Sequence, residues 1–235
     1  MIKVLASGSK GNCYLIKTKK ESLILELGIG FREILKGLNF NLNDVVGCLV
    51  SHKHKDHSRS IVQAVKRGLD VYCNEDVANG VKDNRRINII EPLKKLKIGN
   101  FTILPFDCQH TNSDGAECPN LGFLIQHKEL GKIIFVTDTY YLKYTFSDVD
   151  HILIECNYTE RDLDNLPSYR LRVLKSHMSL EILKDTLKTW GLSSTKDITL
   201  IHLSEINGDN KYFKEEMEKA TGCLVNIAIP KLKIE

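Results

Sequence analysis

Residues 52–57 read His52-Lys53-His54-Lys55-Asp56-His57 and stand at the end of a mostly apolar run that begins at Val45. Imidazole and carboxylate together suit zinc, manganese or iron, whereas calcium and magnesium prefer shells of oxygen atoms. In extended backbone His52 and His54 project to the same side, and after a turn Asp56 and His57 can address a second ion about 3.5 to 4 Å away. The spacing therefore predicts a two-metal site, for which a solvated loop of alternating His and Lys is the plainer alternative.

A two-metal site needs further ligands, and three more candidates follow apolar runs that read as strands. They are His110 after Phe101–Phe106, Asp138 after Ile133–Val136, and His202 after Ile198–Ile201. All three occupy strand ends, where we expect metal ligands.

The composition bounds the class of protein. With 235 residues, 42% of them hydrophobic and 27% charged, and only 5 Pro, the chain has the composition of a globular protein with a sizeable core. Collagen-like, coiled-coil and disordered chains are excluded. The net charge of +3 is too small to identify a nucleic-acid-binding protein by charge alone. The 7 cysteines are scattered without a CxxC pair, so we expect free thiols rather than disulfides or a zinc ribbon.

Targeting signals are also lacking in the sequence. No run approaches about 18 apolar residues, and the segment from Met1 to Leu5 has no signal-peptide pattern. We therefore expect a cytoplasmic protein with no membrane partner. The oligomeric state stays open: a homodimer is one option, and no feature of the sequence demands it.

The order of the expected elements indicates the architecture. Apolar alternation predicts an opening meander of strands at Ile2–Ala6, Cys13–Lys17 and Leu23–Leu27. A helix with Ser58 as N-cap and Gly68 as C-cap follows the strand 45–50. Further strands are expected at 71–73, 87–90, 101–106, 121–126, 133–136, 151–155, 198–202 and 223–227, and helices at 180–190 and 210–221. This order predicts sheets packed face to face with helices outside, in one domain over residues 1–235.

Taken together, these motifs resemble those of the metallo-β-lactamase-fold hydrolases over nearly the whole chain. The opening Ser7-Gly8-Ser9-Lys10-Gly11-Asn12 is more narrowly similar to the small bacterial and phage YycJ-type (WalJ-type) group of nuclease-like phosphodiesterases. The resemblance implies an α/β (α+β) fold, a four-layer αββα sandwich with the site along the shared sheet edges. It also implies that one metal is bound by His52, His54 and His110, the other by Asp56, His57 and His202, with Asp138 bridging.

One position departs from the family's pattern. The family has an apolar strand that ends in Asp-x-Gly, whereas this chain reads Leu25-Glu26-Leu27-Gly28. In the family this carboxylate orients the His-rich loop. A longer Glu26 can still form a hydrogen bond there from a shifted backbone, and the alternative is a surface carboxylate at a strand end.

The expected metals indicate the class of reaction. Two divalent ions lower the pKa of a bridging water and supply hydroxide, so we expect hydrolysis. By resemblance to ribonuclease Z and its phosphodiesterase relatives, Glu155 and His177 lie beside Asp56, and His177 donates a proton to the departing oxygen. These three residues are the expected catalytic set, and the pair Glu155 and His177 favours phosphodiester cleavage.

Substrate contacts are predicted in three segments. Ser7, Ser9 and Asn12 belong to a Gly/Ser turn that can face an anion, for which a plain connecting turn is the alternative. Asn112 follows His110 and can reach a phosphate. Tyr169, Arg170 and Arg172 join an aromatic ring to positive charges, an arrangement typical of single-strand binding, with a solvated face as the alternative.

The predicted function is therefore that of a dinuclear-metal phosphodiester hydrolase, a nuclease with DNA as its substrate and exonuclease-like action, in which hydroxide bridging the metals attacks. DNA and the exonuclease character rest on the resemblance alone. The alternative is a metal-dependent hydrolase of a small molecule, such as a cyclic phosphodiester or a thioester. A third reading is a metal-stabilised binding protein without activity. His and Asp ligands suit both zinc and manganese, so the choice between these two cofactors stays open.

Overall fold

The computed structural model describes residues 1–82, 85–112, 114–165, 176–204 and 209–235. Contacts divide the chain into two compact units: unit 1 comprises Met1–Phe106 and Ala228–Glu235, and unit 2 comprises Asp107–Ile227. The single domain expected over residues 1–235 stays a prediction. Among the described residues, no helix has the length and apolar character that crossing a bilayer requires.

Unit 1 is built on a sheet with the strand order β14-β1-β2-β3-β4-β5-β6. The strands of this unit are β1 (Ile2–Ala6), β2 (Cys13–Lys17), β3 (Ser22–Leu25), β4 (Val45–Leu49), β5 (Val71–Cys73), β6 (Ile87–Ile89), β7 (Leu96–Ile98), β8 (Phe101–Cys108, which continues into unit 2) and β14 (Lys233–Ile234). The expected meander β1-β2-β3 is antiparallel, whereas β3, β4, β5 and β6 are parallel. Strands β7 and β8 form an antiparallel pair.

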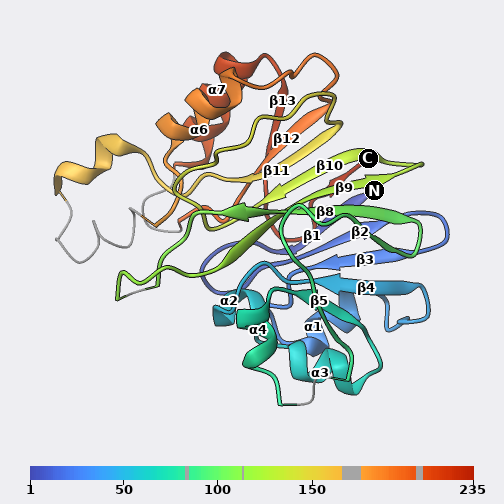
Figure 1. Cartoon of the computed structure of the whole chain (residues 1–235). Helices are drawn as coiled ribbons and strands as arrows, with labels where there is room; N and C mark the ends of the chain where they lie inside the picture. Colours follow the sequence, from blue (N-terminus) through green and yellow to red (C-terminus); the bar gives the residue numbers. More distant parts are fainter. Residues whose placement is uncertain (83–84, 113, 166–175, 205–208) are drawn as a thin grey trace. The chain divides into compact units, whose positions relative to one another are not determined.

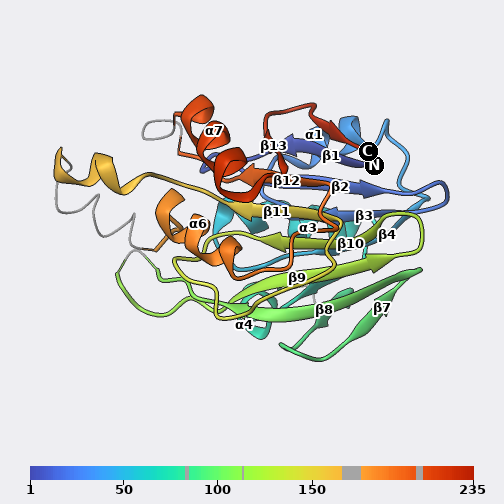
Figure 2. The ribbon, with the colours of Figure 1, turned by 90° about the horizontal axis from the view of Figure 1, so that it is seen from above.

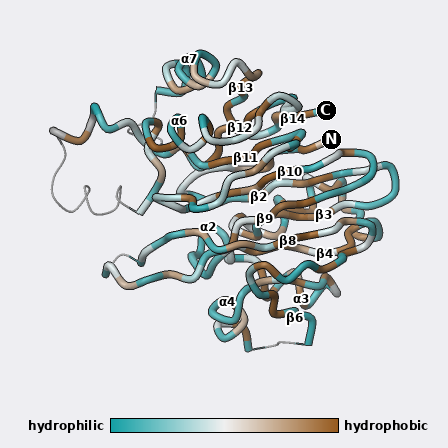
Figure 3. The backbone as a smooth tube through the Cα atoms, turned by 45° about the horizontal axis from the view of Figure 1, so that its top comes forward, coloured by the Kyte–Doolittle hydropathy of each residue, from teal (hydrophilic) through white to brown (hydrophobic). Residues whose placement is uncertain are grey.

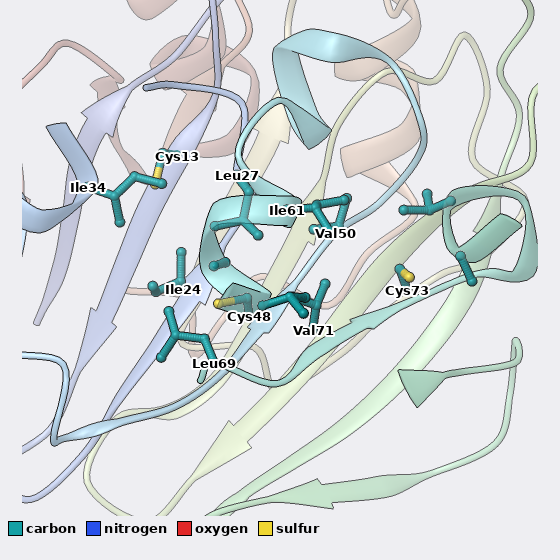
Figure 4. Packing of buried hydrophobic residues seen from close by; sticks show 14 of the residues in the cluster. Cys13, Ile24, Leu27, Ile34, Cys48, Val50, Ile61, Leu69, Val71 and Cys73 are labelled. Carbon is teal, nitrogen blue, oxygen red and sulfur yellow. The ribbon is translucent and has the colours of Figure 1, made fainter. Parts of the chain in front are cut away.

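Four helices connect the parallel strands of unit 1: α1 (Phe31–Gly37), α2 (Lys55–Ser58), α3 (Ile61–Lys66) and α4 (Glu75–Asn79). Their apolar residues and those of the sheet form one buried cluster, in which Ile34 and Ile61 pack with Ile24, Val50 and Val71 (Figure 4). Along the chain, apolar residues concentrate in the strands and hydrophilic residues in the connecting segments (Figure 3). Hydrophobic burial therefore holds the helices against the sheet.

Unit 2 contains five strands in the order β13-β12-β11-β10-β9. They are β9 (Asn120–His127), β10 (Gly131–Val136), β11 (His151–Glu155), β12 (Asp197–Ile201) and β13 (Leu224–Ile227), and the helices are η1 (Glu160–Asn165), α6 (Leu180–Lys188) and α7 (Asn210–Thr221). Strands β9 and β10 are antiparallel, and β10 to β13 are parallel. Helices α6 and α7 lie together beside the parallel strands (Figures 1 and 2). Because parallel strands end at the same edge, residues that follow β10, β11 and β12 are brought together.

The predicted fold class, a mixed α/β protein with two sheets, is confirmed. All the cysteines are free, as expected, and six of the seven are buried. The strand predicted at Leu23–Leu27 ends early, at Leu25, because Glu26 has a φ of 64° and leaves the extended conformation. The helix predicted at 180–190 ends at Lys188. Elements α1, α4, η1, β7 and β14 were not predicted. Segments this short give only a weak hydrophobic period.

Ser58 is not the N-cap that the sequence suggests. It is the last residue of α2, and its hydroxyl donates to the carbonyl of Lys53 at 2.8 Å. Ser60 occupies the N-cap position of α3. The prediction failed because the chain is already helical over Lys55–Ser58, so the first turn of helix begins inside the histidine motif.

Candidate active site

The histidine motif of unit 1, here called the His-rich loop (residues 52–57), follows the carboxyl end of β4. The rings of His52 and His54 have centroids 4.7 Å apart, and those of His52 and His57 are 4.3 Å apart. His52 and His57 are completely buried. The ligand atoms of His52 and His54 lie within 4.8 Å of each other, and so do those of Asp56 and His57. The last three residues of this segment, Lys55 to His57, are helical, because they form the start of α2.

Backbone contacts fix the conformation of the His-rich loop. The amide of Asn12 donates to the carbonyl of Asp56 at 2.7 Å, and the amide of Leu27 donates to that of His57 at 2.8 Å. Gly28 allows this approach, because a Cβ at that position would lie 1.6 Å from the Asp56 carbonyl oxygen. The segments Ser7–Asn12 and Leu23–Gly28 thus support the loop.

Glu26 is part of this support and not a surface carboxylate. Its side chain is completely buried, and its Oε1 accepts a hydrogen bond from the amide of Ser51 at 3.2 Å. Its Oε2 lies 3.6 Å from Nδ1 of His57. Glu26 has a positive φ of 64°, and from this conformation its side chain reaches the His-rich loop.

A second group of residues, here called the Asp138 cluster, gathers at the strand ends of unit 2. It consists of His110, Asp138, Glu155, His177 and His202. Asp138 Oδ1 lies 3.5 Å from Nε2 of His202, and Asp138 Oδ2 lies 3.9 Å from Nε2 of His110. Each oxygen of one carboxylate therefore faces a different imidazole. The ligand atoms of Asp138, Glu155, His177 and His202 all lie within 4.8 Å of one another.

The donor atoms of the Asp138 cluster fit a divalent metal. Separations of 3.5 and 3.9 Å are too long for good hydrogen bonds, whereas two ligands on a tetrahedral zinc ion lie about 3.4 Å apart. Nδ1 of His110 lies 3.0 Å from the carbonyl oxygen of Ser176, which can only accept, so Nδ1 carries the proton and Nε2 has the lone pair. Burial lowers the pKa of His110 despite the nearby Asp138 charge, and this favours the neutral ligand form.

Glu155, which is buried, and His177, which is partly exposed, form a close pair in the same cluster. Nδ1 of His177 donates to Oε1 of Glu155 at 2.6 Å, and the other carboxylate oxygen accepts from the amide of Thr139 at 2.8 Å. Burial lowers the pKa of His177, but the charge and hydrogen bond of Glu155 outweigh it and leave the pKa above its ordinary value. Burial raises the pKa of Glu155, and the His177 charge outweighs this and leaves the pKa below its ordinary value. The pair thus favours an imidazolium beside a carboxylate.

Two asparagines that sequence reasoning missed position the Asp138 cluster. The amide group of Asn120 donates to the carbonyls of Thr137 and Asp138, at 2.8 and 2.7 Å. That of Asn157 donates to the carbonyl of His202 at 2.9 Å. The position of Asn157, two residues after the predicted residue Glu155, could have indicated its role from the sequence. No feature of the sequence indicates the role of Asn120, because its contacts depend on the pairing of β9 with β10.

The predicted substrate-binding residues are described only in part. Ser9 is exposed, and Ser7 and Asn112 are partly buried. Asn12 is completely buried and its side-chain amide donates to the carbonyl of Gly8, so it supports the Gly/Ser turn. Contact of these residues with substrate stays a prediction. Tyr169, Arg170 and Arg172 lie outside the described residues.

Comparison with known proteins identifies the family. Residues 32–203 match the β-lactamase superfamily domain. Exodeoxyribonuclease WalJ of Streptococcus pneumoniae is 30% identical over 229 residues, covering 87% of this chain and 81% of that protein. Exodeoxyribonuclease YycJ of Bacillus anthracis is 32% identical over 151 residues, covering 59% of this chain and 54% of that protein.

A solved structure is similar over the full length. The metallo-β-lactamase fold protein YhfI from Bacillus subtilis aligns with a TM-score of 0.75 and 17% identity, covering 98% of this chain and 97% of that chain. The fold of this family implies divalent metal ions, and the imidazole and carboxylate clusters of both units provide suitable donors. The chain therefore belongs to the β-lactamase superfamily, has the metallo-β-lactamase fold and is a metal-dependent hydrolase.

Proposed function

We propose that this hydrolase cleaves phosphodiester bonds of nucleic acid, with DNA as the substrate, and acts as an exonuclease. Two relatives of this chain are named exodeoxyribonucleases: WalJ is 30% identical and YycJ is 32% identical. The pair of Glu155 and His177 carries the proposal, because a leaving alkoxide of a phosphodiester needs a proton donor. The two units act together as one domain over residues 1–235.

Two divalent ions, zinc or manganese, complete the proposed site. His52, His54 and His110 hold one ion, Asp56, His57 and His202 hold the other, and Asp138 contacts both. The two separate oxygen-to-imidazole approaches of Asp138, at 3.5 and 3.9 Å, support its bridging position. When bound, the ions supply Lewis-acid stabilisation of charge and a nucleophile derived from water at neutral pH.

The side chains of the Asp138 cluster perform the proton transfer. Nδ1 of His177 is held by Glu155, so the ring presents Nε2 and its proton to the departing oxygen. Its side chain keeps 12% exposure, which leaves the ring accessible from one side. The Glu155 charge keeps His177 protonated at higher pH than an ordinary histidine, because the pKa of His177 is raised. Asp56, with 23% side-chain exposure, orients the attacking water.

The first experiment joins metal analysis to two substrates. The protein is purified without chelator, its metal content is measured, and cleavage of bis(p-nitrophenyl) phosphate and of a 5′-labelled single-stranded oligonucleotide is followed. We expect about two metals per chain and cleavage of both substrates. An oligoribonucleotide of the same sequence should be cleaved more slowly than the oligodeoxynucleotide. The ladder of labelled products shows from which end of the strand the enzyme cleaves. Cleavage of the small diester alone would favour the small-molecule alternative, and absence of both metal and activity would reject the proposal.

A variant of His177 tests the proton transfer. His177→Asn is expected to slow oligonucleotide cleavage about 10²- to 10⁴-fold. The same variant should slow cleavage of bis(p-nitrophenyl) phosphate far less, because p-nitrophenolate leaves without a proton. The matched control is His151→Asn, since Nδ1 of His151 also contacts a carboxylate oxygen, of Asp197, at 2.6 Å, away from the Asp138 cluster. Equal losses on both substrates would contradict the assignment of His177 as general acid.

A further inference from the structure

The exposed face of α2 and α3 in unit 1 is positively charged. Between Lys53 and Leu69 the sequence contains one acidic residue, Asp56, which belongs to the His-rich loop. The cations of this face, here called the α2–α3 face, are Lys55, Arg59, Lys66 and Arg67, and all four are exposed. They form no ion pair with any residue in the part of the chain that the structure describes. Their charge is therefore directed to solvent.

The α2–α3 face ends in an open pocket of about 650 Å³. The pocket, here called the α3 pocket, is lined by Val65, Lys66, Gly68, Asp70, Arg85 and Arg86. Among its described lining residues, three cations and one carboxylate give a net charge of +2, and Asp70 pairs with Arg86 at 3.0 Å. Gly68 has a φ of +85°, and a Cβ there would meet no atom within 4 Å, so the backbone at this wall is open to a ligand.

The topology of unit 1 places this pocket at the amino ends of the parallel strands, whereas the His-rich loop follows the carboxyl end of β4. His52 follows the carboxyl end of β4, whereas Asp70 and Arg86 precede the amino ends of β5 and β6. These three strands are parallel, so the two positions are at opposite edges. The five residues of β4 span about 16 Å. The α2–α3 face connects these two edges (α2 and α3 in Figure 1).

We propose that the α2–α3 face and the α3 pocket bind the sugar-phosphate backbone of the nucleic-acid substrate. This inference rests on the proposed function and extends it to a second binding surface on unit 1. Cations distributed over two consecutive helices suit a polymer with regularly repeated negative charges better than a single small anion. Phosphates of a stacked strand are about 3.4 Å apart along the axis, so about 16 Å corresponds to roughly five nucleotides. Shorter substrates do not reach the pocket.

The test compares two variants that lose the same charge. Lys66→Gln/Arg67→Gln removes two cations of the α2–α3 face, and Lys19→Gln/Lys20→Gln removes two exposed lysines of the turn between β2 and β3. Affinity for a fluorescent single strand of about 20 nucleotides is measured over a range of salt concentrations. The first variant should bind more weakly, with the slope of log K against log salt reduced by about 1.4, or about 0.7 for each lost phosphate contact. The second should keep the wild-type slope.

Activity separates this proposal from the one it rests on. Lys66→Gln/Arg67→Gln should raise KM for the long oligonucleotide and leave kcat/KM for bis(p-nitrophenyl) phosphate unchanged. Thermal unfolding establishes that both variants are folded. Equal slopes in the two variants would overturn the proposed surface, even if the wild-type protein cleaves DNA. A difference in slope without cleavage of any diester would support the surface and reject the nuclease function.

Discussion

Three residues of the candidate site have left-handed backbone conformations. Glu26, Asp138 and His202 have φ values of 64°, 48° and 52°, and each stands just after a strand. Such conformations cost about 1–3 kcal/mol and persist where the surrounding contacts determine them. At Asp138 these contacts come from Asn120, whose amide group donates to the carbonyls of Thr137 and Asp138, which are the carbonyls on the two sides of the Asp138 Cα. Asn120 therefore orients the carboxylate that we propose as the bridging ligand.

Replacement of Asn120 should weaken metal binding. Asn120→Ala removes both hydrogen bonds, and we expect metal affinity to fall about 10- to 100-fold, as for other residues that orient a ligand. Competition with a chelator measures this affinity directly. The control is Thr195→Val, which removes a 2.9 Å hydrogen bond to the Val149 carbonyl before β11 and should leave metal affinity unchanged. If the two variants bound metal equally well, Asn120 would have only a structural role.

At the scale of elements, Asp150 joins the starts of three parallel strands. Its carboxylate accepts from the amide of Lys132 at 2.8 Å and pairs with Nζ of Lys196 at 3.0 Å, so it connects β10, β11 and β12. Burial raises the pKa of Asp150, but the bond from Lys132 and the charge of Lys196 outweigh it and leave the pKa below its ordinary value. A carboxyl whose folded pKa is lower than its unfolded pKa stabilises the protein at higher pH, and this stabilisation is lost as pH falls through the folded value.

Replacement of Asp150 should therefore destabilise the protein in a pH-dependent way. Asp150→Asn is expected to cost about 1 kcal/mol at pH 7, a value reduced for partial exposure to solvent. The difference from wild type should shrink as pH falls below about 4, where the carboxyl becomes protonated first in the unfolded state and then, at lower pH, in the folded state. Urea unfolding at pH 7 and at a pH below about 4 measures this difference in the free energy of unfolding. Glu215→Gln, which removes an exposed charge on α7, should stay within about 0.5 kcal/mol of wild type, and a pH-independent loss in Asp150→Asn would contradict the argument.

At the scale of the whole molecule, the proposed ligands come from both units. The His-rich loop belongs to unit 1, whereas His110, Asp138 and His202 belong to unit 2. If the two groups hold the same ions, as we propose, neither unit retains the ion after loss of a ligand from the other. Binding of metal then stabilises both units together, by about 2.7 kcal/mol at a free metal concentration of 100 Kd.

A double variant tests this shared binding. His54→Ala and His110→Ala each remove a ligand from the same proposed ion, so each should lower the metal content by about one ion per chain, and the double variant should lose no more. Elemental analysis after dialysis gives the stoichiometry. His127→Ala is the matched control, because Nδ1 of His127 accepts from the amide of Glu129 in a turn. Additive losses in the double variant would show that the units bind metal independently.

The sequence by itself determined which residues carry the chemistry, because ligand types and apolar runs are local properties. It placed His110, Asp138 and His202 at strand ends and the helix of α7 at Asn210–Thr221, as observed. It also determined the fold class and, through its family, hydrolase activity. Boundaries near the motif failed at Glu26 and Ser58, where φ and helix capping depend on the neighbouring segments.

Only the tertiary structure decided how these residues contact one another. The bonds from His177 to Glu155, from Asn120 to Asp138 and from Ser51 to Glu26 join residues 22, 18 and 25 positions apart. Such contacts depend on strand order and register, which hydrophobic periodicity does not specify. The cations of the α2–α3 face lie in one stretch of sequence, whereas Arg85 and Arg86 of the α3 pocket come from a later segment, which the parallel pairing of β5 and β6 brings beside Lys66.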